Sequence, residues 1–214
     1  MTVARGMHER LTSRVYPLAI PLPQDAKTGW KSHPVFRGAT EVLQSLSCHV
    51  AVLSTNHVPH PPHGHKEEEI LLLLSGEVGL ILPDKRAPGG GLRKRLTPGQ
   101  FVYYPNHFPH TLQTVSEVPA NYLMYKWQND PADFGSPLAF SHFRGPSSEK
   151  SKVGDGFHTH LVFERPTRCL RKLHCHTSTL TPGAGYDPHS DAYDVAIIVL
   201  EGEIETLEGA DFLS

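Results

Sequence analysis

Short apolar runs separated by turn-forming residues dominate the chain from about residue 40 onward. The longest run, Ile70 to Leu74, is apolar at every position, follows a loop that contains Pro62 and Gly64, and ends shortly before Gly76. A continuous apolar run bounded in this way indicates a strand buried on both faces, although leucine alone would also suit a helix. Shorter runs follow at residues 48–53, 78–82, 101–104 and 122–125. This succession of short strands, without a long helical periodicity, predicts an all-β sandwich or barrel.

The same pattern divides the chain into four segments. Residues 1–40 are rich in proline, which predicts an N-terminal arm, and residues 41–128 contain enough strands for one complete barrel. Residues 129–169 hold many glycines, prolines and serines, which indicates a linker. Residues 170–214 then repeat the beginning of the barrel, so we expect a partial second copy.

An internal repeat is the basis for this partial second copy. Three pairs of short matches mark it, at an offset of 127 residues and then of 126: residues 46–49 with 173–176, residues 62–63 with 188–189, and residues 76–78 with 202–204. The second copy covers about the first half of a barrel, and open sheet edges are usually covered or paired. We therefore expect it to pack on the first barrel or to be exchanged with another subunit, and we expect a homodimer.

Histidines and a carboxylate gather next to the longest apolar run. His63, His65 and Glu69 are separated by even spacings, so in a regular strand their side chains would point to the same side. His110, which follows the strand expected at residues 101–104, is the natural fourth member of the set. Three imidazoles and one carboxylate make a mixed nitrogen and oxygen site, which suits first-row divalent metals. The sequence therefore predicts one divalent transition metal here, namely Fe, Mn, Zn, Ni, Cu or Co.

Neighbouring residues leave two questions open. Glu68 could replace Glu69 as the ligand, because the repeat aligns Glu68 with Asp194, but the parity of the positions favours Glu69. His60 and His107 lie close to the set in sequence, and each is either a proton-transfer residue or a plain loop residue. Both are therefore candidates for a catalytic role.

The ligand set resembles the first motif of the cupin superfamily, which runs G-x5-H-x-H-x3,4-E-x6-G. His63, His65, Glu69 and Gly76 fit this motif, and His57 stands in place of its leading glycine. A different residue at that glycine alters a turn more than it alters a metal site, so the ligand assignment holds.

The second cupin motif, G-x5-P-x-G-x2-H-x3-N, is matched by Gly99, Pro105 and His110. His107 and Thr114 depart from it, because they replace a glycine and the closing asparagine. The resemblance implies a small antiparallel jelly-roll β-barrel with the metal at its inner end, followed by a partial second cupin repeat.

Other histidines in the chain fit the motifs less well. His158, His160 and Glu164 share the H-x-H-x3-E spacing, but no glycine, long apolar strand or partner histidine follows them at the required distances. The second copy keeps one of the ligand residues, as His189. We expect no metal at either place.

Composition and charge narrow the possible functions. The formal net charge of −2 gives no reason to expect a nucleic-acid partner. No apolar stretch approaches the roughly 20 residues of a transmembrane helix, so no membrane association is expected. Three cysteines do not suggest a disulfide framework. Residues 1–14 lack the pattern of a signal peptide, and we therefore expect a cytoplasmic protein.

The resemblance to cupins implies a metal-binding protein with a small-molecule substrate or ligand. The first expectation is a metal-dependent enzyme, either an oxygenase or a non-redox isomerase, lyase or hydrolase, that acts on a small polar metabolite. The alternative is a non-catalytic cupin that binds a sugar or a carboxylate. The fold does not choose between the two.

Overall fold

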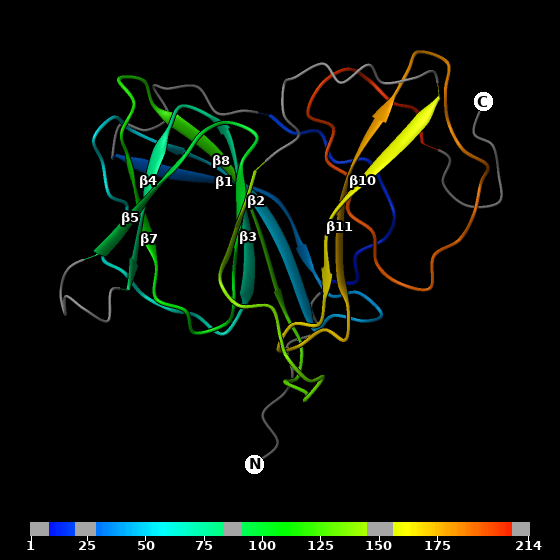
Figure 1. The fold of residues 1–214 in the computed structure, drawn as a ribbon, viewed down its shortest axis with the longest axis horizontal. Helices are drawn as coiled ribbons and strands as arrows, with labels where there is room; N and C mark the ends of the chain where they lie inside the picture. The colour runs from blue at the N-terminus through cyan, green and yellow to red at the C-terminus, as the bar shows by residue number, and fades with distance from the viewer. Residues whose placement is uncertain (1–8, 20–28, 84–90, 145–155, 207–214) are drawn as a thin grey trace.

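The computed structural model describes residues 9–19, 29–83, 91–144 and 156–206, and within these residues the chain is all β (Figure 1). The described residues form eleven strands and no α-helix: β1 (Trp30–Gly38), β2 (Ser45–Leu53), β3 (Glu68–Ser75), β4 (Val78–Pro83), β5 (Gly91–Leu96), β6 (Phe101–Tyr104), β7 (Thr111–Thr114), β8 (Ala120–Gln128), β9 (Ser141–Phe143), β10 (Phe157–Arg165) and β11 (Leu173–Leu180). The predicted all-β class is thereby confirmed. Among these residues there is also no helix of the length and apolarity that crossing a membrane requires.

Two antiparallel sheets form the barrel. One has six strands in the order β1-β2-β8-β3-β6-β9, and the other has three strands in the order β5-β4-β7. Their inner faces share one hydrophobic core, to which Leu71 and Leu73 of β3, Leu80 of β4 and Leu112 of β7 contribute. Strands distant in sequence lie side by side and every pairing is antiparallel, which is the arrangement of a jelly roll.

Strand β3 is apolar at successive positions because both of its faces are covered. Leu71 and Leu73 face the barrel core, whereas Leu72 belongs to a second cluster on the outer face of the six-stranded sheet. Each of the three side chains is buried. The strand predicted for residues 70–74 is therefore confirmed, and helix, the competing interpretation, is excluded there.

The boundaries of the arm and of the linker differ from the expectation. Residues 30–38, which fell within the predicted arm, form β1 and pair with β2 at the edge of the six-stranded sheet. Pro34 is tolerated on this edge strand because it lies at a register irregularity, where a missing N–H interrupts little of the ladder. The predicted linker, residues 129–169, contains β9 and β10. Most of β10 is exposed and polar, so its sequence lacks the apolar signal of a core strand.

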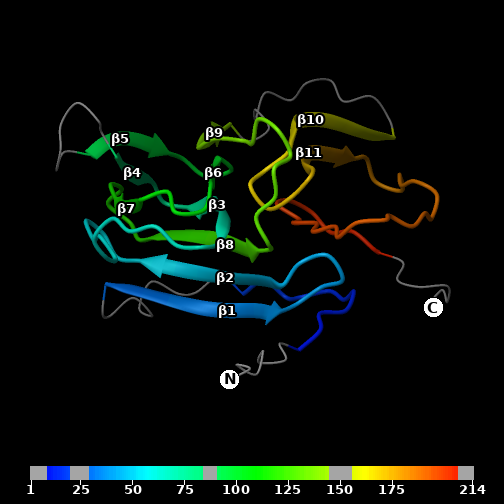
Figure 2. The same ribbon diagram turned by 90° about the horizontal axis from the view of Figure 1, so that it is seen from below.

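The hairpin of β10 and β11 repeats the hairpin of β1 and β2 (Figure 2). The register of the first hairpin, in which Trp30 pairs with Leu53, returns 127 residues later, with its irregularity at the same place. Each hairpin also closes in the same way, because the hydroxyl of Thr40 or Thr167 accepts two backbone N–H groups of its turn. The repeat thus begins near residue 156 instead of residue 170, and the described residues after β11 form no further strand.

A second hydrophobic cluster packs the two hairpins against each other on the outer face of the six-stranded sheet. It contains residues that the repeat makes equivalent, such as Leu43 and Leu170, or Cys48 and Cys175. The partial second copy therefore packs on the first barrel, which is one of the two arrangements expected from the sequence.

Two carboxylates make matching contacts across this interface. The hydroxyl of Thr167 donates to Oε2 of Glu68 at 2.6 Å, and the hydroxyl of Thr40 donates to Oδ2 of Asp194 at 2.5 Å. The repeat aligns Glu68 with Asp194, so each half holds the turn of the other half in the same way. Glu68 is buried and accepts further hydrogen bonds from the side chains of Tyr103, Trp127 and Cys169 and from the backbone N–H of Arg168.

Candidate metal centre

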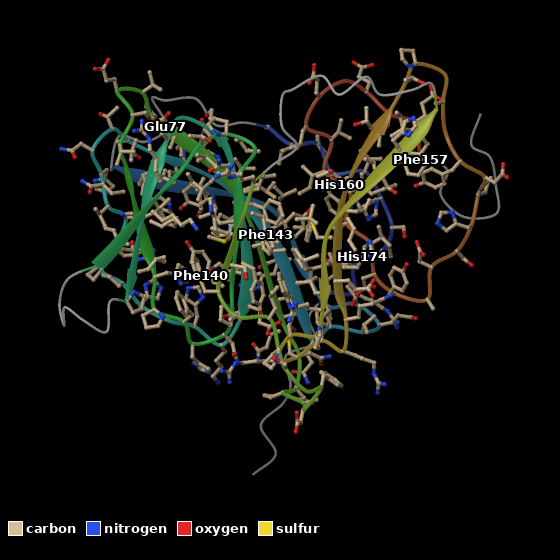
Figure 3. The ribbon with its side chains drawn as sticks, viewed as in Figure 1. Glu77, Phe140, Phe143, Phe157, His160 and His174 are labelled. Atoms are coloured by element: carbon tan, nitrogen blue, oxygen red, sulfur yellow. The ribbon has the colours of Figure 1, made fainter. Side chains whose placement is uncertain are left out.

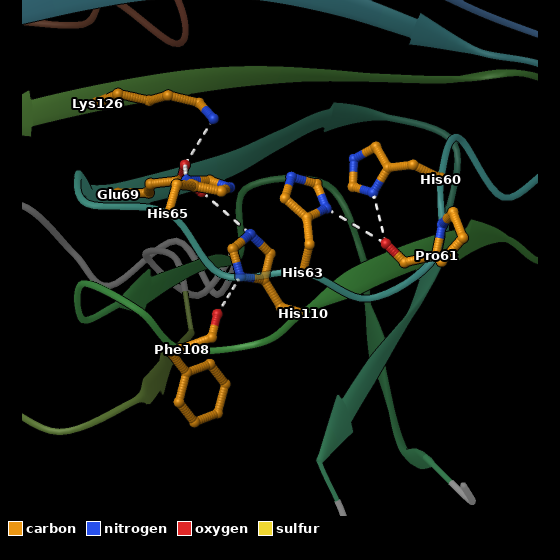
Figure 4. Close-up of polar contacts among 8 residues, drawn as sticks. All are labelled: His60, Pro61, His63, His65, Glu69, Phe108, His110 and Lys126. Carbon is orange, nitrogen blue, oxygen red and sulfur yellow. Dashed lines mark hydrogen bonds and ion pairs between the residues drawn. The ribbon is translucent and has the colours of Figure 1, made fainter.

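Loops and one strand bring the predicted ligands close to one another (Figure 4). Glu69 is the second residue of β3, whereas His63 and His65 lie in the loop before that strand. His110 lies directly before β7, and its backbone pairs with that of His63 through two N–H···O hydrogen bonds of 3.2 and 3.3 Å. The regular strand assumed in the parity argument therefore begins too late to hold the two histidines, and the backbone bridge positions His63 instead.

Three of the four side chains form a compact group. Nδ1 of His65 lies 2.5 Å from Oε1 of Glu69, and Nε2 of His110 lies 3.1 Å from Oε2 of the same carboxylate. Within the described part of the chain, these three residues are the one group whose possible metal-binding atoms all lie within 4.8 Å of one another. The ring of His63 is adjacent, with its centroid 4.9 Å from that of His65 and 6.4 Å from that of His110. The inclusion of His63 in the ligand set stays a prediction.

Backbone carbonyls orient two of the imidazoles. Nδ1 of His110 lies 2.8 Å from the carbonyl oxygen of Phe108, and Nδ1 of His63 lies 3.2 Å from that of Pro61. An Nδ1–H that donates to a carbonyl leaves Nε2 with its lone pair, which is the form that binds a metal. The ring of Tyr104 also stacks on His110, with centroids 3.8 Å apart and planes 10° apart. His110 is thus held in place from two sides.

The buried carboxylate of Glu69 is kept ionised by its neighbours. Burial would raise the pKa of this carboxyl, but His110, His65 and Lys126 outweigh burial and hold the pKa below its ordinary value. Nζ of Lys126 lies 2.6 Å from Oε1. Despite these short distances, neither oxygen has a hydrogen-bond partner of good geometry among the described residues. A buried carboxylate that has an ammonium group beside it but lacks directed donors, and that lies next to two imidazoles, fits a divalent metal.

The two candidates for proton transfer, His60 and His107, differ in whether their rings lie near the ligand cluster. The ring of His60 packs edge-on against that of His63, with centroids 4.2 Å apart, and burial lowers the pKa of His60 below its ordinary value. His107 has an exposed side chain and a φ of 59°, a left-handed conformation at the position where the cupin motif has glycine. Its backbone N–H donates to the carbonyl of His65 at 2.6 Å. The structure thus brings the His60 ring to the ligands, whereas His107 supports them through its backbone.

Two residues near Glu69 were missed in the sequence. Lys126 is the register partner of Glu69 on β8, and it continues the inward-facing positions of Tyr122 and Met124. His49 approaches from β2, where burial, helped by the charge of Lys126, lowers the pKa of its imidazole to about 4. The alternation along β8 was a usable signal for Lys126, because every second residue of that strand faces the core.

The structure also separates the alternatives for the acidic ligand. Glu69 faces the imidazoles, whereas Glu68 faces the interface with the second hairpin. In the other H-x-H-x3-E motif, Glu164 contacts Nδ1 of His174 at 2.8 Å, on the hairpin shown in Figure 3. Glu69 is therefore the acidic residue that lies beside the imidazoles, and its choice as the ligand stays a prediction.

Comparison with known proteins points to one family. A family model described as a cupin domain matches residues 50–125, which include the four predicted ligands. A solved structure of an oxalate decarboxylase variant from Bacillus subtilis is 23% identical, with a TM-score of 0.34, and the match covers 39% of this chain and 21% of that chain. A Cupin_2 domain of an XRE family transcriptional regulator from Enterobacter cloacae is 19% identical, with a TM-score of 0.39, and the match covers 48% of this chain and 99% of that one.

The chain thus spans about a fifth of the length of the oxalate decarboxylase. No curated protein matches it. The domain match coincides with the antiparallel barrel and with the cluster of histidines and glutamate at its end. Residues 50–125 of the chain are thus similar to a cupin domain.

Proposed function

We propose that this chain is a metal-dependent enzyme that acts on a small polar metabolite, as an oxygenase or as a non-redox isomerase, lyase or hydrolase. The observation that carries the proposal is the buried carboxylate of Glu69, which lies between the imidazoles of His65 and His110. His63 is exposed and adjacent to this group, so the cluster borders on solvent and a small molecule can reach it.

His63, His65, Glu69 and His110 would hold one divalent transition metal. Bound there, the metal would act as a Lewis acid, activate water or activate oxygen, depending on the element. The protein contributes preorganisation, because carbonyl contacts fix His63 and His110 and β3 fixes Glu69. Such support orients metal ligands before the metal arrives.

His60 is the proton-transfer residue of the proposal. Its Nδ1 lies 3.1 Å from the carbonyl of Pro61, which leaves Nε2 as the proton acceptor. Because burial lowers the pKa of its imidazole, His60 is neutral at pH 7 and available as a base. Its contact with His63 places it beside the ligand cluster without making it a ligand.

Turnover by protein loaded separately with each candidate metal tests this proposal. Oxygen consumption and product formation would be followed with a panel of small carboxylates, hydroxy acids and sugars. We expect turnover with at least one metal. Glu69→Gln should lose both the metal and the turnover, whereas His60→Gln should keep the metal and turn over more slowly. His174→Gln, on the exposed hairpin, is the control and should be unchanged. Saturable binding without turnover across the panel would favour the non-catalytic alternative.

A further inference from the structure

Three inward-facing side chains form a row across the six-stranded sheet at the level of the ligand cluster. Glu69 of β3 is flanked by its register partners, Tyr104 on β6 and Lys126 on β8. Side chains directly opposite one another in a sheet share a face, with Cβ atoms about 5 Å apart. Tyr104 belongs to the barrel core, so the face that carries this row is the barrel interior. A cation and a hydroxyl therefore stand on either side of the predicted acidic ligand.

Lys126 brings a positive charge to this row. Its ammonium lies 2.6 Å from Oε1 of Glu69, and its side chain is 27% exposed. Among the described residues, Glu69 is its one acidic ion-pair partner. The neighbouring residues along the inner face of β8, Tyr122 and Met124, are apolar or aromatic and belong to the core. A lysine at this position is therefore an exception to the pattern of its own strand.

Tyr104 brings an unpaired hydrogen-bond donor. Its side chain is 1% exposed, and its hydroxyl has no hydrogen-bond partner among the described residues. Stacking on His110 fixes the ring and with it the position of the phenol oxygen. Buried hydroxyls are rarely left without a partner, and an acceptor supplied by a ligand would satisfy this one.

Metal binding would change the charge balance of the row. Without a metal, Lys126 and Glu69 neutralise each other across 2.6 Å. Metal-bound imidazoles are neutral, so a divalent ion adds two positive charges beside a single carboxylate. The ammonium of Lys126 would then share its acidic partner, Glu69, with a cation. A negatively charged ligand would compensate the charge of the ammonium and that of the metal.

Aromatic side chains line the same end of the barrel. Phe108 and Phe140 stack on each other with centroids 5.2 Å apart, and Tyr104 lies 6.1 Å from Phe108 and 5.6 Å from Phe140. Phe108 and Phe140 pack against the barrel core, so an apolar surface lies beside the row. A compact anion is therefore the ligand that the row itself favours.

We propose that Lys126 and Tyr104 form an anion-recognition subsite beside the metal, and that the substrate or ligand of this site is a small carboxylate. The ammonium of Lys126 pairs with the carboxylate, and the hydroxyl of Tyr104 donates a hydrogen bond to it. This inference rests on the proposed metal-dependent function, and it narrows the small polar metabolite of that proposal to an anion.

Acetate binding to the full chain loaded with cobalt(II) tests the subsite without requiring turnover. The visible absorption of bound cobalt would be followed as acetate is added at constant ionic strength, with neutral acetamide as the matched probe. Wild type should bind acetate saturably and acetamide at least about tenfold more weakly, since a charge-assisted contact is lost. Lys126→Met should weaken acetate binding about tenfold while it retains cobalt, and Lys126→Arg should restore most of the affinity.

Tyr104→Phe removes the hydroxyl and keeps the stacked ring, so it should weaken acetate binding by a few-fold without loss of cobalt. Lys172→Met is the control, because Lys172 is an exposed lysine whose contacts are with Glu164 and with the ring of Tyr193. The inference is overturned if Lys126→Met binds acetate as tightly as wild type, or if Lys126→Arg binds it as weakly as Lys126→Met. It is also overturned if wild type binds acetate and acetamide equally well. A wild type that takes up no cobalt would instead overturn the proposed function itself, so the two failures are distinguishable.

Discussion

At the scale of single residues, the backbone conformation of His107 favours a structural role for this residue over a catalytic one. A φ of 59° is unfavourable for a residue with a Cβ, and glycine adopts it without strain. The loop is also tight, because a Cβ on Gly64 would come within 2.7 Å of the carbonyl oxygen of His107. His107→Gly should therefore retain the metal and raise the free energy of unfolding by roughly 0.5–1 kcal/mol.

Urea unfolding and metal analysis of His107→Gly would check this prediction. Turnover of the same variant would decide whether the ring takes part in proton transfer. An intact rate would leave His60 as the single candidate, whereas a large loss of rate with metal retained would contradict the backbone role assigned to His107.

His49 should make the stability of the metal-free protein depend on pH. Its pKa is about 4 in the folded protein against an ordinary value of 6.5, so between these values the unfolded chain binds a proton that the folded chain does not. Stability should therefore rise as pH increases from 4 to 6.5 and should lose this contribution as pH falls, by on the order of 3 kcal/mol. Chemical unfolding at several pH values would measure the slope. His49→Gln should flatten it within that window, and an unchanged slope would mean that His49 is not held neutral by burial.

At the scale of elements, the two turns that close the hairpins allow a matched comparison. Thr167 contacts the buried Glu68, and Thr40 makes the equivalent contact with the exposed Asp194. Thr167→Val should cost about 1–2 kcal/mol more than Thr40→Val, because a buried carboxylate that loses a donor is not compensated by water. Unfolding of both variants in urea would measure the difference. Equal costs would indicate that the Glu68 contact contributes no more to stability than its exposed counterpart.

Much of the element pattern was predictable, and the exceptions have physical causes. The apolar runs of β3, β4, β6 and β8 gave these strands because core strands bury one or both faces. β1 and β10 were missed because prolines and exposed polar residues conceal edge strands, whose register depends on pairing partners far away in sequence.

The sequence predicted which residues form the candidate site, but it did not predict most of their contacts. Spacing found Glu69, His65 and His110, which the structure brings into one group. It could not show that Nδ1 of His110 faces a backbone carbonyl, or that Tyr104 and Lys126 flank Glu69. The positions of Tyr104 and Lys126 come from the order of strands in the sheet, which local sequence does not specify. The His110 contact depends on the conformation of the loop before β7.

At the scale of the whole molecule, the second hairpin packs on the first barrel, but the segment that follows this hairpin exposes apolar side chains to solvent. Val195, Ile197 and Leu200 are 57%, 58% and 53% exposed. Exposed apolar clusters are usually covered in solution. We keep the homodimer as a prediction and expect a solution mass of twice the 23.7 kDa of the chain. Light scattering would measure it, and Ile197→Glu should shift the mass toward the monomer. A monomeric wild type at high concentration would contradict the prediction.

The central claim is that this barrel holds a divalent metal between its histidines and Glu69. The most direct test is the metal content, by elemental mass spectrometry, of the full chain purified without a metal-affinity tag. His63→Ala and His110→Ala would be measured beside it, with His174→Ala on the exposed hairpin as the control. We predict close to one transition metal per chain in the wild type and in the control, and its loss in both ligand variants. A wild type that carries no metal and takes none up, or a His110→Ala variant that keeps its full metal content, would contradict the account.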